Sequence, residues 1–204
     1  MKELKSNYKK YWKDIRQRLK EFEKVTHPNM FYELCFCLTT PQSNAKKCNE
    51  AVCLLAGKDL LNSKVHLQEM HQILQPRTRF FRNKSRYILL MKRDYESIKC
   101  IVAGKNISPE EIREELVLRV KGMGMKESSH FLRNIGFKNL AILDRHILRN
   151  LVKYKVIPEL PGSLNKKNYL EIEKKFQSFA KKVKIPMDEL DLLFWAAETG
   201  EVFK

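Results

Sequence analysis

Apolar residues recur at three- and four-residue steps along almost the whole chain, which is the spacing of one face of an amphipathic helix. No stretch alternates apolar and polar residues as a half-buried strand would, and the sequence contains no internal repeat. The pattern begins in a first helix whose outer face is basic. Its apolar positions are Tyr8, Tyr11, Trp12, Ile15, Leu19 and Phe22. The sequence therefore predicts an all-α fold.

Helix-breaking and capping residues divide the following stretch. The nearly all-apolar segment 31–38 predicts a buried helix that stops at 39–41, where two threonines precede a proline. We expect the next helix over 44–56, with Gly57 as a left-handed cap. Ser63 is expected to cap a further helix, which ends at Pro76.

The second half begins with a strong helix start, in which Ser108 can cap, Pro109 lies in the first turn and Glu111 can complete a capping box. This helix is expected to run to about Val120. The later expected helices are 125–134 with Gly136 as its cap, 145–154 opened by Asp144, and two helices over 168–195 that Pro186 separates.

The charge balance of the chain indicates what kind of partner the protein binds. Lys and Arg number 40 against 24 Asp and Glu, a formal net charge of +16 with a pI near 9.7. A field of this sign favours polyanions such as nucleic acid; the alternative is a lysine-rich surface that serves solubility or ion-pair networks. No apolar run approaches the ~20 residues that span a bilayer, and the first residues lack a signal-peptide pattern. We expect an intracellular protein of the cytoplasm or nucleoid with no membrane contact.

The five cysteines do not form a recognisable metal or disulfide pattern. They contain no C-x-x-C pair, and no histidine lies at a spacing that would complete a zinc site. We expect no metal, and most of the cysteines to be small buried hydrophobic residues. The cysteines are Cys35, Cys37, Cys48, Cys53 and Cys100.

The stretch 77–87 mixes cations with aromatic residues. Such a mixture fits phosphate contacts beside a stacking surface, and equally fits a helix with a solvated basic face and buried rings. Its members are Arg77, Arg79, Phe80, Phe81, Arg82, Lys84, Arg86 and Tyr87.

Gly122 and Gly124 lie between two expected helices, which makes this turn a candidate phosphate-binding hairpin. Glycines can turn sharply with positive φ and approach a ligand closely, and the amides at the start of the second helix can then bind a phosphate oxygen. Lys126 lies in the first turn of that helix, where the dipole disfavours the charged form of an amine. Taken alone, Lys126 is better explained as an ordinary surface lysine among the 40 basic residues of the chain.

Two motifs together resemble a known enzyme family. The segment 120–133 (VKGMGMKESSHFLR), followed by Leu143-Asp144-Arg145-His146, resembles the helix-hairpin-helix DNA glycosylases, and most of all the second type of 8-oxoguanine DNA glycosylase, found chiefly in archaea and some thermophilic bacteria. The 18 residues from Lys126 to Asp144 (144 minus 126) match the family pattern. The loop 40–43 (TPQS) and the tail 188–204 are also similar, so the resemblance covers nearly the whole chain.

Two departures place the chain within this superfamily. Endonuclease III-like members carry four C-terminal cysteines for an iron–sulfur cluster, whereas no cysteine follows Cys100 here. The chain is also too short for the additional N-terminal domain of the eukaryotic 8-oxoguanine enzymes. The resemblance thus implies a single unit, 1–204, of two helical lobes with the lesion pocket between them and the helix-hairpin-helix at about 108–135.

The resemblance implies a bifunctional enzyme that removes oxidised guanine from double-stranded DNA and nicks the abasic site. Lys126 would be the nucleophile, and Asp144 would stabilise charge and move protons while also capping a helix. Trp195 would stack on the flipped base, the terminal carboxylate of Lys204 would bind its N1–H and amine, and Gln42 would fill the gap or touch the opposite cytosine. No cofactor is implied, and we expect a monomer.

Two other functions remain open at this point. One is a glycosylase for a different damaged base on the same scaffold; Lys126 disfavours the members for alkylated bases, which use aspartate and water. The other is a non-catalytic module that uses the hairpin only to bind phosphates.

Overall fold

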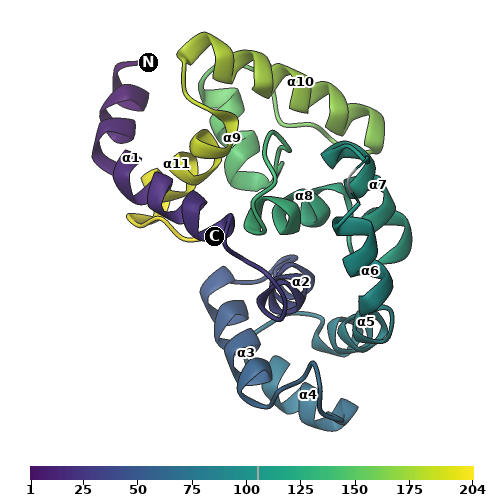
Figure 1. Ribbon diagram of the computed structural model, residues 1–204. Helices are drawn as coiled ribbons and strands as arrows, with labels where there is room; N and C mark the ends of the chain where they lie inside the picture. Colours follow the sequence, from purple (N-terminus) through teal and green to yellow (C-terminus); the bar gives the residue numbers. More distant parts are fainter. Residues whose placement is uncertain (105) are drawn as a thin grey trace. The chain divides into compact units, whose positions relative to one another are not determined.

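The computed structural model describes residues 1–104 and 106–204, and every regular element in this part of the chain is a helix. The all-α prediction is confirmed (Figure 1). The helices are α1 (Lys2–Phe22), α2 (Asn29–Thr39), α3 (Ala45–Gly57), α4 (Leu67–Leu74), α5 (Phe81–Arg93), α6 (Tyr95–Val102), α7 (Pro109–Arg119), α8 (Met125–Asn134), α9 (Arg145–Lys153), α10 (Lys166–Val183) and α11 (Met187–Thr199).

The chain divides into two compact units. The first contains 1–25 and 132–204, and the second contains 26–131. In the first unit α11 packs against α1, α9 and α10, and the alignment of α1 with α11 is visible in Figure 1. Its core includes Ile15, Phe176 and Phe194, each at most 1% exposed.

The second unit is organised around α2, which packs against α3 and α5. Eight of its eleven residues are buried, as the apolar segment 31–38 predicts. Phe31 meets the ring of Tyr95 edge to face, with centroids 5.0 Å apart, and so joins α2 to α6. Cys35, Cys37 and Cys48 are also buried, which confirms that most of the cysteines are core residues.

The structure confirms three of the predicted caps. Ser108 and Glu111 form a complete capping box at the start of α7, Asp144 accepts the Ile147 N–H at 2.8 Å, and Gly136 ends α8 with φ +94°.

Two predicted caps are wrong. Gly57 remains helical, and the left-handed residue that follows α3 is Asp59. Ser63 does not cap α4, whose N-cap is His66; its hydroxyl instead donates to the Lys58 carbonyl at 2.8 Å, within the turn after α3.

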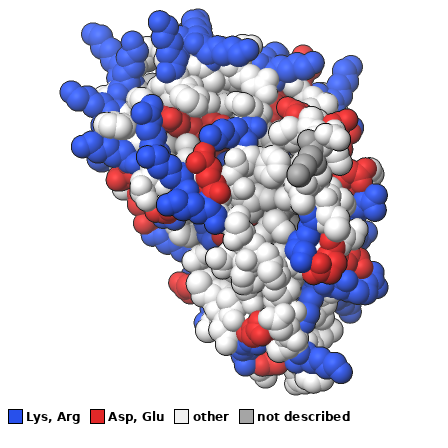
Figure 2. Space-filling view, viewed as in Figure 1, with Lys and Arg blue, Asp and Glu red and all other residues white. Residues whose placement is uncertain are grey.

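Basic side chains are dense over two helices of the first unit. Figure 2 shows Lys and Arg side chains crowding the surface over α10 and α1. Within the described residues no helix is both long enough and apolar enough to cross a membrane. The exposed lysines of α10 are Lys166, Lys167, Lys174, Lys175, Lys181 and Lys182.

Candidate active site

The turn between α7 and α8 depends on a glycine at one of its two positions. Gly122 has φ +94°, and the Met123 N–H donates to the Val120 carbonyl at 3.1 Å to close the turn. A Cβ on Gly122 would lie 2.3 Å from Cδ2 of Tyr87, far inside contact distance. Both the backbone conformation and the packed ring therefore exclude a side chain at Gly122.

Gly124 does not need a positive φ, so that part of the prediction is wrong for this residue. Its carbonyl accepts the Ser128 N–H at 3.0 Å, which makes it the residue from which α8 begins. The Gly124 N–H donates to Oε2 of Glu127 at 3.2 Å. The Glu127 carboxylate thus accepts a hydrogen bond from an amide at the start of the helix, where the sequence predicts that a phosphate oxygen would bind.

Lys126 is the second residue of α8, and its side chain is 24% exposed. Its Nζ lies 3.1 Å from Oε1 of Glu127, so the same carboxylate bonds the hairpin amide and pairs with the amine. Further along α8, His130 packs edge to face on Phe36 with ring centroids 5.6 Å apart. Arg113 of α7 donates to Ser129 Oγ at 3.1 Å. These contacts fix the helix that carries the amine.

Asp144 stands at the start of α9, after a buried extended segment. The Ala141 N–H donates to Oε1 of Glu173 at 2.7 Å, and the Tyr169 hydroxyl donates to the Ala141 carbonyl at 2.5 Å. Two side chains of α10 thereby hold the backbone that leads to the carboxylate. Because Asp144 also accepts the Ile147 N–H, its side chain has a fixed orientation.

Trp195 projects from α11 against the helix that Asp144 caps. Its indole meets His146 edge to face, with centroids 5.1 Å apart and an interplanar angle of 73°. His146 Nδ1 pairs with Glu198, which also accepts from Asn150 Nδ2 at 2.9 Å. Trp195 Nε1 is buried and has no acceptor among the described residues. The motif that contains Asp144 includes His146, but the sequence alone assigned His146 no role.

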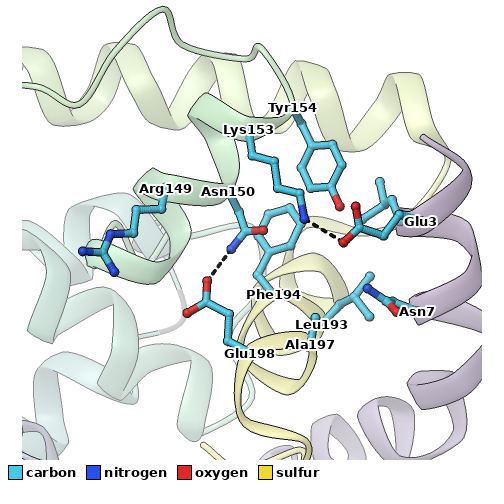
Figure 3. Close-up of a pocket in the computed structure, with 11 residues that line it drawn as sticks. Glu3, Asn7, Arg149, Asn150, Lys153, Tyr154, Leu193, Phe194, Ala197 and Glu198 are labelled. Carbon is cyan, nitrogen blue, oxygen red and sulfur yellow. Dashed lines mark hydrogen bonds and ion pairs between the residues drawn. The ribbon is translucent and has the colours of Figure 1, made fainter.

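A small cavity of about 140 Å³ lies in the same unit, among α1, α9 and α11 (Figure 3). Glu3 and Lys153 pair at 2.7 Å within it, and Figure 3 shows Arg149 directed away from the other labelled side chains. None of the predicted site residues lines this cavity, although Asn150 and Glu198, which lie beside His146, do.

The other predicted pocket residues lie outside the helices. Gly200, at φ +86°, ends α11, and the partly buried Lys204 follows four residues later. Gln42 is exposed at φ +55°, in a turn closed by the Ser43 N–H donating to the Thr40 carbonyl at 2.9 Å. Asp144, Trp195 and Lys204 belong to the first unit, and Gln42, Gly122, Gly124 and Lys126 belong to the second.

The mixed stretch 77–87 contains one cation that cannot contact phosphate. Arg79, Arg82 and Arg86 are exposed, but Lys84 is 4% exposed, so its inclusion among the candidate phosphate contacts is wrong. Periodicity could have revealed this, because Lys84 lies four residues before Ile88 and seven before Met91 on the buried face of α5. Phe80 is 54% exposed and lies at φ +58° just before the helix.

A helical hairpin with a lysine in the first turn of its second helix, followed by an aspartate that caps the next helix, defines the class of helix-hairpin-helix DNA glycosylases. The family model described as 8-oxoguanine DNA glycosylase matches residues 15–185, and the chain belongs to this family. The resemblance drawn from the sequence is confirmed.

Individual relatives are similar in sequence to this chain over nearly their full length. The chain is 45% identical to an 8-oxoguanine DNA glycosylase/AP lyase of Fusobacterium nucleatum, over 99% of this chain and 96% of that protein. It is 38% identical to the protein of that name from Methanocaldococcus jannaschii, over 92% and 89% of the two chains.

Solved structures agree as well. The 8-oxoguanine DNA glycosylase of Thermotoga maritima superimposes with a TM-score of 0.89 at 32% identity, over 100% of this chain and 97% of that one. The Methanocaldococcus jannaschii glycosylase/lyase in complex with a 15mer DNA containing 8-oxoguanine gives 0.88 at 32% identity, over 100% of both chains.

Proposed function

We propose that this chain excises 8-oxoguanine from double-stranded DNA and then nicks the abasic strand, with Lys126 as nucleophile. The observation that carries the proposal is the position of Lys126, in the first turn of a helix that follows a glycine hairpin. Membership of the 8-oxoguanine DNA glycosylase family supports both activities. The protein acts on DNA as a monomer in the cytoplasm, at the nucleoid.

The base must first leave the duplex, because C1′ of a stacked nucleotide is out of reach of a protein side chain. The lone pair of Lys126 Nζ then attacks C1′, and the bond from C1′ to the base breaks. The electron pair leaves with the base, which takes up a proton. Opening of the sugar ring leaves a Schiff base between Nζ and C1′.

The second step uses the imine as an electron sink. Loss of a C2′ proton delivers its electron pair towards C1′, the bond between C3′ and its oxygen breaks, and the 3′ phosphate departs. This β-elimination nicks the strand. Hydrolysis of the imine then regenerates the amine, so the chain needs no cofactor for either step.

Asp144 stabilises the positive charge that develops on the sugar as the base departs, and helps to move protons to and from the amine. Its position as an N-cap supports this role, because the hydrogen bond from Ile147 fixes the carboxylate before DNA arrives. A fixed carboxylate does not have to reorganise while the charge develops.

The remaining predicted site residues recognise DNA and base. The backbone at Gly122 and Gly124 contacts phosphate, which requires Glu127 to release the Gly124 amide or share it. Trp195 stacks on the extruded base, Lys204 contacts its hydrogen-bonding edge, and Gln42 faces the opposite strand. Deleting Lys204 is expected to reduce 8-oxoguanine excision more than cleavage at a preformed abasic site, where no base is present.

Borohydride trapping tests the nucleophile. Reduction of a Schiff base joins enzyme to DNA irreversibly, so the wild type is expected to form a covalent complex with an 8-oxoguanine duplex and Lys126→Gln to form none. Lys58→Gln is a matched control, because Lys58 is exposed and pairs with Glu69. Both residues lie far from the hairpin in the sequence. A wild type that binds the duplex without trapping would indicate a DNA-binding module, and loss of nicking alone in Lys126→Gln would indicate attack by water.

A further inference from the structure

Lys84 is a buried lysine whose ammonium is enclosed by oxygen atoms. Its Nζ donates to the carbonyls of Thr39 and Pro41, each at 2.7 Å. It also lies 2.8 Å from Thr78 Oγ1 and 3.0 Å from Ser43 Oγ. An ammonium has three N–H donors, so all of them are occupied by these four acceptors.

Three of the four acceptors belong to the turn 39–43, which begins at the last residue of α2. The last carbonyls of a helix have no partner within the helix, and a cation at this end also offsets the helix dipole. The Thr78 hydroxyl reinforces the arrangement by donating to the Thr39 carbonyl at 2.8 Å. Ser43 Oγ accepts the Arg79 N–H at 3.0 Å. The ammonium thus ties the turn to the start of α5.

This arrangement is costly for a residue that would serve only packing. Burial is the largest cause that lowers the pKa of Lys84, and with repulsion by Lys126 and Arg79, and against the opposite effect of Cys48 and Glu127, the pKa falls to about 8. The interaction with Lys126 also places this ammonium in the electrostatic surroundings of the proposed nucleophile. An apolar side chain would fill such a position without the cost of desolvating a charge.

The turn that Lys84 holds presents one exposed polar side chain. Gln42 lies between the two segments that Lys84 bonds, at φ +55°, a conformation that a non-glycine residue adopts only when its surroundings impose it. We propose that Lys84 is a positioning residue: its ammonium holds the 39–43 turn so that Gln42 is presented to the DNA strand opposite the lesion. This inference rests on the proposed function, in which Gln42 faces that strand.

Hydrogen exchange tests the positioning without reference to catalysis. In Lys84→Met the amides of Thr40 and Ser43 are expected to exchange about tenfold faster or more, because the turn loses its charged hydrogen bonds. Lys92→Met is the matched control, since Lys92 lies on the same helix and donates to the carbonyl of Ser63, outside the turn. Unchanged exchange of both amides in Lys84→Met would overturn the inference.

Opposite-base discrimination tests what the turn is for. The measured quantity is the ratio of single-turnover excision rates for 8-oxoguanine opposite cytosine and opposite a tetrahydrofuran residue, which has no base. Gln42→Ala and Lys84→Met are each expected to lower this ratio about tenfold, and the double variant to lower it no further, because coupled residues are not additive. A uniform loss of rate on both duplexes in Lys84→Met, with the ratio unchanged, would mean a merely structural role and overturn the inference.

Two further outcomes separate this inference from the proposed function. If Lys84→Met lacks a cooperative melting transition, Thr78→Val is used in its place, since this change removes one acceptor and keeps the lysine. The amide exchange rates and the opposite-base ratio are then expected to change in the same direction by a smaller factor. If neither changes, the inference is overturned. A wild type that excises no 8-oxoguanine refutes the proposed function. The role of Gln42 falls with it, whereas the exchange comparison still decides whether Lys84 holds the turn.

Discussion

The indole of Trp195 stands edge-on to the imidazole of His146, and His146 is fixed in turn by its pairing with Glu198. Trp195 and Glu198 belong to α11 and His146 to α9, so the two helices together set the orientation of the indole. A flat ring held in this way offers a surface for an extruded purine at little entropic cost.

Trp195→Ala is expected to slow excision of 8-oxoguanine by about tenfold to a hundredfold, because stacking of a base on an aromatic side chain contributes roughly 1–3 kcal/mol. Cleavage at a preformed abasic site should change much less, since no base is present to stack. Single-turnover rates on the two substrates give the comparison. Trp12→Ala serves as the control on α1, and an equal loss on both substrates in Trp195→Ala would argue against stacking.

Asp144→Asn should lower the excision rate by about a hundredfold or more while the melting temperature stays within about 2 °C. Asparagine caps a helix as well as aspartate does, so the amide keeps the bond from the Ile147 N–H but loses the charge. Asp144→Ala should lose the rate and also about 1 kcal/mol of stability. Thermal melting beside single-turnover kinetics separates the two effects. If the asparagine variant melts as early as the alanine variant, the carboxylate has a structural role instead.

The two glycines of the hairpin should respond differently to alanine. Gly122→Ala introduces a Cβ against the Tyr87 ring at φ +94°, so we expect a loss of roughly 2 kcal/mol or more, about 4–8 °C in melting temperature, together with weaker duplex binding. Gly124→Ala meets only Oε2 of Glu127 at 3.2 Å and should cost less than about 1 kcal/mol. Equal effects in melting and fluorescence anisotropy would contradict the geometry of the turn.

The pKa of Lys84 predicts how stability changes with pH. It is about 8 in the folded protein and near its ordinary value of 10.5 in the unfolded chain. Between these values the unfolded chain binds more protons, so the free energy of unfolding rises with pH across this window by up to about 3 kcal/mol. Below pH 8 the full penalty of burying the charge is present.

Urea denaturation of the wild type and Lys84→Met between pH 7.5 and about 10 checks this sign. The wild type should gain stability relative to the variant as the pH rises, because methionine does not titrate and the other groups cancel in the difference. A difference in unfolding free energy that is flat or falls over this range would mean that the pKa of Lys84 is not lowered by folding.

The sequence predicts those parts of the site that local rules determine. Ser108 and Asp144 are caps whose partners lie three residues away, so their roles follow from short-range geometry. Gly122 follows equally well from its place between two helices. The failures at Gly57 and Ser63 have a non-local cause, because several neighbouring residues could end or begin each helix and only packing selects one.

Lys84 could not be interpreted in the same way. Its acceptors Thr39 and Pro41 lie more than forty residues earlier in the chain, and no local pattern joins them to α5. The hydrogen bond from the Gly124 N–H to Glu127 was not predicted from the sequence either, although the two residues have the spacing of a capping box. The sequence alone indicated the function but not the geometry of the site, because the spacing of Lys126 and Asp144 resembles that of a family whose chemistry is known.

The packing of α1 against α11 joins two segments that are synthesised at widely separated times. α1 is synthesised before residues 26–131 and α11 after them, so the apolar residues Leu4, Tyr11 and Ile15 lack the packing of α11 until 187–199 have been made. The unit formed by 26–131 is contiguous and can complete its core while the rest is still being made. We therefore expect a chain truncated before 187 to keep the unit 26–131 folded while the apolar face of α1 is left exposed to solvent.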